Sequence, residues 1–183
     1  MPEFITTYTG RHFYPTAPRA EDLDIRDIAH ALSLLCRGNG HVQSFFSVGQ
    51  HCIACTREAL ARGCSRWVAL ACLLHDASEA YLSDVPRPFK KELPAYRTLE
   101  ENLLTVIYGK YLGRPLTDEE QTVIRQIDDD LLWYDLQELL RETPERPAPV
   151  LQHAFSHPVE PFAQVEETYL RLFAELTDGG EGQ

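Results

Sequence analysis

The 183-residue sequence has few basic residues and no long hydrophobic run. Its 17 Lys and Arg residues stand against 28 Asp and Glu residues, which gives a formal net charge of −11 at pH 7. Proteins that bind nucleic acid normally carry a basic surface, so we expect no nucleic-acid partner and favour a small molecule. The longest uninterrupted apolar stretch covers residues 67–74, far short of the roughly 20 residues of a membrane-spanning helix, so we expect no membrane partner.

The sequence also lacks the features of secreted and of disordered proteins. Its first residues do not form the basic and then apolar regions of a secretory signal, which favours a cytoplasmic protein. Hydrophobic residues make up 44% and charged residues 25% of the chain, close to the averages of globular proteins. A typical domain has about 150 residues, so we expect a single domain over residues 1–183.

The five cysteines are an odd number and fall in helix-like stretches, so we expect reduced thiols rather than disulfides. Cys52-x-x-Cys55 has the spacing of a zinc or redox pair. A zinc site of that kind would need a second ligand pair at similar spacing, and a redox pair would follow a strand. The sequence offers neither, and we interpret Cys52 and Cys55 as structural residues.

Apolar residues recur at helical spacing over most of the chain, and capping motifs mark several helix starts. Ser47-x-x-Gln50 and Thr117-x-x-Glu120 are capping boxes. We expect an all-α bundle of about six helices, over residues 24–37, 47–61, 66–81, 95–112, 117–140 and 160–177. Outside these helices we expect an irregular or short β N-terminal arm (1–21), a core over about 22–142, a loop at 83–88 and a linker at 143–149.

The most informative segment is His75-Asp76-Ala77-Ser78-Glu79, at the end of the most apolar predicted helix. Ionisable groups are costly to bury there unless something pairs with them. Glu79 follows His75 by four residues and Asp76 by three, so it shares a helical face with each. A metal ion at this end of the helix would satisfy these groups.

Two further residues extend this candidate site. His51 lies early in the predicted helix over 47–61, and Asp128 lies within the helix over 117–140. Two histidines and two carboxylates form a donor set for one divalent ion such as manganese, cobalt or zinc, with magnesium as an alternative. Spacing alone does not establish that the three helices bring them together.

Longer strings around these residues resemble the HD-domain metal-dependent phosphohydrolases. Ser47-Val48-Gly49-Gln50-His51 is similar to the family's S-V-[AG]-[EQ]-H segment. His75-Asp76-Ala77-Ser78-Glu79, followed by Asp84-Val85-Pro86-Arg87-Pro88-Phe89-Lys90, resembles the H-D-A-S-E…D-[LV]-P-x-P-x-K stretch of its 5′-deoxynucleotidase branch. Among three consecutive aspartates, Gln126-Ile127-Asp128 matches the family's Q-A-D. The resemblance covers about residues 24–140.

The resemblance implies a role for each matching residue. The metal ligands would be His51, His75, Asp76 and Asp128, and Asp76 would also take part in catalysis. Glu79 would activate or relay the attacking water, Asp84 would contact the sugar, and Arg37 would contact phosphate, although Gly38 stands where those relatives have Trp. Lys90 and Arg87 are further candidates for binding phosphate. His12, His153 and His157 lie in loop-like segments, and we expect no role for them.

The function implied by the resemblance is hydrolysis of the 5′-phosphate of (deoxy)nucleoside monophosphates through a metal-activated water. One alternative is a triphosphohydrolase that releases tripolyphosphate from a deoxynucleoside triphosphate. A second is a non-catalytic nucleotide-binding module, and a third is a redox protein that uses Cys52 and Cys55. Because members of the family form dimers, we expect a homodimer or a higher homo-oligomer.

Overall fold

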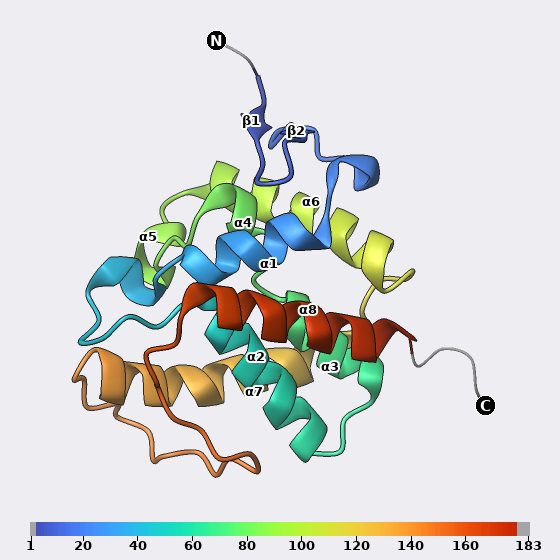
Figure 1. Ribbon diagram of the computed structural model, residues 1–183. Helices are drawn as coiled ribbons and strands as arrows, with labels where there is room; N and C mark the ends of the chain where they lie inside the picture. The colour runs from blue at the N-terminus through green and yellow to red at the C-terminus, as the bar shows by residue number, and fades with distance from the viewer. Residues whose placement is uncertain (1–2, 179–183) are drawn as a thin grey trace.

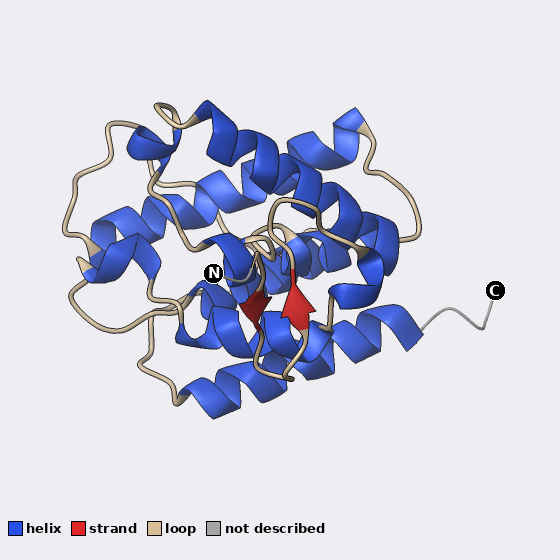
Figure 2. Ribbon diagram, turned by 90° about the horizontal axis from the view of Figure 1, so that it is seen from above, coloured by secondary structure: helices blue, strands red, loops and turns tan. Residues whose placement is uncertain are grey.

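The computed structural model describes residues 3–178, which form a bundle of helices with a short β-hairpin on one side (Figure 1). Strands β1 (Ile5–Thr6) and β2 (His12–Phe13) pair antiparallel, with Ile5 opposite Phe13. The view from above shows the hairpin lying over the helices (Figure 2). The predicted all-α class with a short β arm is therefore confirmed.

All six expected helices are present, and three of them have both ends within two residues of the prediction. These three are α2 (Val48–Ala61), α6 (Pro94–Tyr111) and α8 (Phe162–Asp178). The remaining elements are η1 (Ala20–Asp22), α1 (Ile25–Leu34), η2 (Arg37–Gly40), α3 (Arg66–Leu74), α4 (Glu79–Leu82), α5 (Arg87–Lys90), α7 (Asp118–Tyr134) and the π-helical turn η3 (Asp135–Leu139). Within the described residues, no helix is both long and apolar enough to cross a membrane.

Helix α3 lies at the centre of the bundle. The hydroxyl of Ser65 accepts the backbone N–H of Val68 and caps its start. Every residue of α3 from Val68 to Leu74 is buried, because α2, α6, α7 and α8 pack around it. Burial of an uninterrupted apolar run drives the folding of this region. The end of α3 is consequently held at a fixed place in the interior.

The predicted continuous helix over 66–81 is wrong, because α3 ends at Leu74 and α4 begins at Glu79. The backbone N–H groups of Ala77 and Glu79 donate to carbonyls three residues back, which tightens the chain into turns. The ring of His75 bonds the Cys72 carbonyl at 2.7 Å and takes an acceptor that a regular helix would use. His75 and Asp76 lie within this break, and Glu79 begins the helix that follows it.

Three other predicted boundaries are also wrong. The helix expected over 24–37 ends at Leu34, because the N–H of Arg37 donates to the carbonyl of Phe46 and draws the chain toward α2. The loop expected over 83–88 already contains the start of α5. The helix expected over 117–140 changes at Asp135 from α-helix to the wider π-helical turn η3.

Residues 141–161, which we call the strap, connect η3 to α8 and include the expected linker. The indole N–H of Trp133 donates to the Arg146 carbonyl at 2.9 Å, and the Tyr134 hydroxyl donates to the Pro149 carbonyl at 2.7 Å. Further along, the N–H groups of Gln152 and His153 donate to the carboxylate of Glu58 on α2. The strap is therefore packed against α2 and α7 rather than a free connection.

Candidate metal centre

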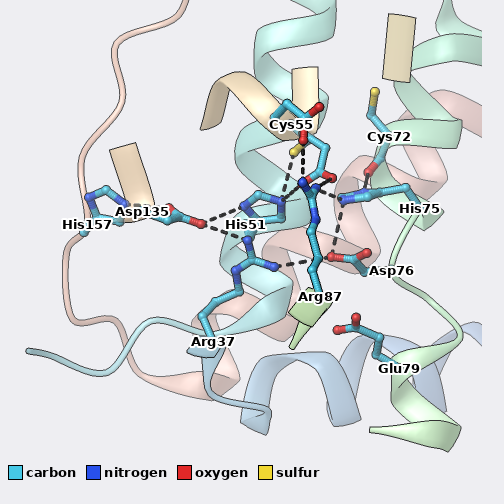
Figure 3. Close-up of polar contacts among 12 residues, drawn as sticks. Arg37, His51, Cys55, Cys72, His75, Asp76, Glu79, Arg87, Asp135 and His157 are labelled. Carbon is cyan, nitrogen blue, oxygen red and sulfur yellow. Dashed lines mark hydrogen bonds and ion pairs between the residues drawn. The ribbon is translucent and has the colours of Figure 1, made fainter. Parts of the chain in front are cut away.

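The four residues expected to bind metal meet where α2, the end of α3 and α7 converge. Figure 3 shows three of them, His51, His75 and Asp76. His51 Nε2 lies 3.0 Å from Asp128 Oδ1. His75 Nε2 lies 3.8 Å from the same oxygen and 3.3 Å from Asp76 Oδ2. His51 is buried and the His75 side chain is 9% exposed, whereas the two carboxylates are each about one-fifth exposed, at 20% for Asp76 and 19% for Asp128. The cluster thus opens to solvent on its acidic side.

Each imidazole uses its Nδ1 atom to contact an acceptor behind it. His75 Nδ1 bonds the Cys72 carbonyl at 2.7 Å, which requires that this nitrogen carry the proton. His51 Nδ1 lies 3.2 Å from Asp135 Oδ2, an approach whose angle falls short of a regular hydrogen bond. His75 Nε2 therefore directs a lone pair toward the cluster, the arrangement that histidine ligands of metals usually have, and His51 Nε2 faces Asp128.

Three donor separations in the cluster are compatible with a shared divalent ion. Bond lengths of about 2.0–2.2 Å to a tetrahedral zinc ion place two nitrogen or oxygen donors about 3.3–3.6 Å apart. The distance from His51 to Asp128 is 3.0 Å, below that range, and the distance from His75 to Asp128 is 3.8 Å, above it. The distance from His75 to Asp76 is 3.3 Å, at its lower end. In the described part of the chain, His75 Nε2 is buried without a hydrogen-bond partner. A buried polar atom without a partner costs free energy, which a bound cation would remove.

The electrostatics of the cluster also favour a cation. Burial raises the pKa of Asp128, but its hydrogen bond to His51 and the nearby imidazole of His75 outweigh burial and hold that pKa well below its usual range. Burial lowers the pKa of His75, yet the charge of Asp76 and other neighbours raises it well above its usual value. The surroundings therefore stabilise positive charge at this point, carried either by protonated imidazole or by a metal ion.

Behind the metal ligands, Asp135 joins three other residues. Arg37 Nη2 lies 3.0 Å from Asp135 Oδ2, and Arg37 Nη1 lies 3.6 Å from Asp76 Oδ2. His157 of the strap bonds the other Asp135 oxygen through Nε2 at 2.7 Å. These contacts hold the pKa of Asp135 far below its usual range in spite of burial, which by itself raises it. Asp135 thus fixes both His51 and Arg37.

Sequence reasoning missed Asp135 and assigned no role to His157. A signal for Asp135 was available, since it follows Asp128 by seven residues, or two helical turns, and shares its face of the helix. The structure brings His157 into contact with Asp135, because the strap returns this residue to η3. No spacing in the sequence indicates that return.

Glu79 lies beside the candidate ligands at the start of α4. Its Oε1 is 3.9 Å from Lys90 Nζ, and its Oε2 is buried without a partner among residues 3–178. Burial, followed by the charges of Asp76 and Asp84, raises the pKa of Glu79 well above its usual value. Lys90 also bonds Glu100 at 2.6 Å. Burial raises the pKa of Asp84 as well.

The three consecutive aspartates of α7 point to different surroundings. Asp128 faces the imidazoles and is bonded by Arg87 Nη2 at 2.6 Å. Asp129 is about half exposed and pairs with Arg87 Nη1. Asp130 is buried on another side, where it bonds Arg62 at 3.0 Å. Among the three, Asp128 is the one placed to share a metal ion with His51 and His75.

All five cysteines are free thiols, and two of them border the centre. Cys55 Sγ lies 3.5 Å from His51 Nε2. Donor atoms of His51, Cys55 and His75 lie within 4.8 Å of one another, as do those of Cys52, His75 and Asp76. We expected Cys52 and Cys55 to be structural residues. Both are buried, and their sulfur atoms also border the candidate metal centre.

Comparisons with known proteins leave the activity open. No family model matches the sequence. The chain is 42% identical over 108 residues to the uncharacterized protein YfdR of Escherichia coli, a match that covers 59% of this chain and 58% of YfdR. It is 33% identical over 110 residues to the uncharacterized protein RCAP_rcc00048 of Rhodobacter capsulatus, covering 56% and 55%. The chain thus spans less than two thirds of the length of each relative.

Proposed function

We propose that this protein is a metal-dependent phosphohydrolase that removes the 5′-phosphate from (deoxy)nucleoside monophosphates. The observation that carries the proposal is the convergence of His51, His75, Asp76 and Asp128, with both imidazole Nε2 atoms directed at the cluster. This convergence supports the role that the extended sequence motif implies for the same four residues.

One divalent ion would be held by four residues, His51, His75, Asp76 and Asp128. When bound, the ion supplies Lewis-acid chemistry: it polarises a phosphoryl oxygen and lowers the pKa of a water molecule. His75 would contribute a fixed lone pair, because the Cys72 carbonyl holds its Nδ1, and Asp135 lies beside Nδ1 of His51. The two carboxylates contribute negative charge on the side that opens to solvent.

Arg37 is placed to bind the phosphate group. Its guanidinium is largely buried, 13% exposed, and lies 3.6 Å from Asp76. Asp135 fixes it in this position from behind. A phosphoryl group in transfer carries negative charge on its equatorial oxygens, and a fixed cation in a poorly hydrated site stabilises that charge. Arg87 and Lys90, on α5, supply further positive charge at the same opening.

Glu79 would transfer the proton that the reaction requires. Burial and the charges of Asp76 and Asp84 raise the pKa of Glu79, so its carboxyl group holds a proton more readily and would act on the attacking water or on the departing sugar oxygen. Asp84 follows α4 and interacts electrostatically with Arg37 and Lys90. It would accept a hydrogen bond from a sugar hydroxyl.

The proposal is tested by product analysis with defined metals. The protein is stripped with chelator, supplied separately with Mn²⁺, Co²⁺, Zn²⁺ or Mg²⁺, and incubated with dAMP or dATP. We expect orthophosphate and deoxyadenosine from dAMP. Tripolyphosphate from dATP would instead identify a triphosphohydrolase, and no turnover with any of the four metals would contradict an enzymatic role and favour the nucleotide-binding module.

A further inference from the structure

A cysteine of α2 contributes a sulfur atom to the candidate metal centre. Cys55 follows His51 by one helical turn, so both side chains project from the same face of α2. Cys55 is buried, and its Sγ lies 3.5 Å from His51 Nε2, the ring atom that also faces Asp128 (Figure 3). The sulfur is therefore on the metal-facing side of His51.

The distance of 3.5 Å is the separation expected of two donors to one ion. A Zn–S bond of about 2.3 Å and a Zn–N bond of about 2.0 Å, at a tetrahedral angle, place sulfur and nitrogen about 3.5 Å apart. The same three-atom group includes His75, whose Nε2 is buried and lacks a partner in the described chain. This second observation indicates that the sulfur borders a place prepared for a ligand.

The sulfur changes which metal the centre prefers. Imidazole and carboxylate donors accept manganese, cobalt, zinc and, less well, magnesium. A thiolate is a soft donor that suits Zn²⁺ and Co²⁺ and binds Mg²⁺ poorly. Cys52 is also near, but it groups with His75 and Asp76, whereas Cys55 directly contacts His51 Nε2. The geometry thus favours Cys55 over Cys52.

We propose that Cys55 is a fifth metal-binding residue of this centre and that its sulfur makes the site selective for Zn²⁺ or Co²⁺ over Mg²⁺. The inference rests on the metal site of the proposed function but not on the substrate or the reaction. It departs from the structural role that the sequence suggests for Cys55.

The inference is tested by titrating the chelator-stripped, reduced full-length chain with Co²⁺ alone. A cobalt–sulfur bond produces a strong near-ultraviolet charge-transfer band, whereas nitrogen and oxygen donors give only weak visible bands. We expect the strong band in the wild-type chain and in Cys72→Ser, and its loss in Cys55→Ser. Cys72 is a matched control, because it is buried nearby and its sulfur points away from the cluster (Figure 3).

Competition with Zn²⁺ provides a second measurement. Loss of one soft donor should weaken Zn²⁺ binding roughly tenfold or more and leave Mg²⁺ binding unchanged. Cys55→Ala serves beside Cys55→Ser, and circular dichroism confirms that each variant is folded. If both variants fail to fold, the wild-type spectrum still decides, because a wild-type Co²⁺ complex without the strong band overturns the inference.

Other outcomes separate this inference from the proposed function. A strong band that survives in Cys55→Ser, or that disappears only in Cys52→Ser, overturns the role of Cys55. Turnover of dAMP by a wild-type protein that lacks the band leaves the proposed function intact and overturns the inference. A sulfur-dependent band without any nucleotide hydrolysis supports the inference and contradicts the function. Failure to bind Co²⁺ at all overturns both.

Discussion

Two clusters of charged residues lie between the same helices, α2 and α7, yet they are built differently. The first, the Glu58–Asp130 cluster, contains two carboxylates and two arginines, Arg62 and Arg146. Glu58 accepts from Arg62 and from two backbone N–H groups of the strap. Asp130 accepts from Arg62, Arg146 and Gln126. Its charges balance, and both carboxylates have several donors.

The second cluster is the candidate metal centre. Within residues 3–178, some of its buried polar atoms have no hydrogen-bond partner, and its carboxylates outnumber its Arg and Lys side chains. His75 Nε2 and Glu79 Oε2 are buried without partners within the described residues. Carboxylates outnumber the Arg and Lys side chains, since Asp76, Glu79, Asp84, Asp128 and Asp135 face Arg37, Arg87 and Lys90. A fully partnered cluster stabilises the fold, whereas an incompletely partnered one retains capacity for a ligand.

The largest expected effect comes from removing a metal ligand. His75→Ala should abolish metal retention and reduce dAMP hydrolysis to background, because the ion loses a fixed lone pair. Asp130→Ala in the other cluster should destabilise the fold but keep the metal. Elemental analysis after gel filtration, together with denaturant unfolding, measures both. A His75→Ala variant that retains metal and activity would contradict the assignment.

Removal of the proton-transfer group should have the next largest effect. Glu79→Gln keeps the shape of the side chain but removes its titration, so kcat should fall by about 10²–10⁴-fold. Metal content should stay unchanged, because Glu79 is not among the four expected ligands. The comparison is made by steady-state kinetics on metal-loaded protein. Unchanged kcat would remove Glu79 from the mechanism.

A smaller effect is expected at Asp135, which positions His51 and Arg37 without itself binding metal. Asp135→Asn weakens the contact to His51 Nδ1, and metal affinity should fall about 10–100-fold. His157→Gln should act in the same direction but less, since it contacts only the far oxygen of Asp135. Competition with a metal indicator measures affinity, and equal affinity in wild type and Asp135→Asn would refute the positioning role.

The smallest effect on activity is expected at Glu58, where only stability should change. Burial raises the pKa of Glu58, but hydrogen bonds from Gln152, His153 and Arg62 lower it below its usual value of 4.5. Because the folded pKa lies below the unfolded one, Glu58 contributes stability above about pH 4.5, and this is lost as the pH falls through the folded pKa.

Glu58→Gln should therefore lower the free energy of unfolding by about 1–3 kcal/mol at pH 7, since a buried charged hydrogen bond is lost. The difference between wild type and variant should shrink in acid. Urea unfolding of metal-free protein at pH 7 and pH 4 measures it. A constant difference at both values would show that Glu58 is not the titrating group.

Much of the helical fold could be predicted from local signals. Ser47 and Thr117 form the capping boxes that the sequence indicates, and their hydrogen bonds fix the starts of α2 and α7. The break after Leu74 could not be predicted in this way. Ala77 and Ser78 are compatible with a helix, so no residue type marks the interruption. Arg37 left its predicted helix because of a contact outside that helix, the backbone pairing with Phe46.

By itself, the sequence determined the class of fold, the order of the helices and the types of residue that the candidate centre contains. Helical periodicity and capping depend on neighbours within a few residues, so they are visible along the chain. Only the tertiary structure decided that His51 meets Asp128, 77 residues away, and that the strap returns His157 to Asp135. Helical spacing fixes side chains within one helix, whereas the packing of helices fixes them relative to one another.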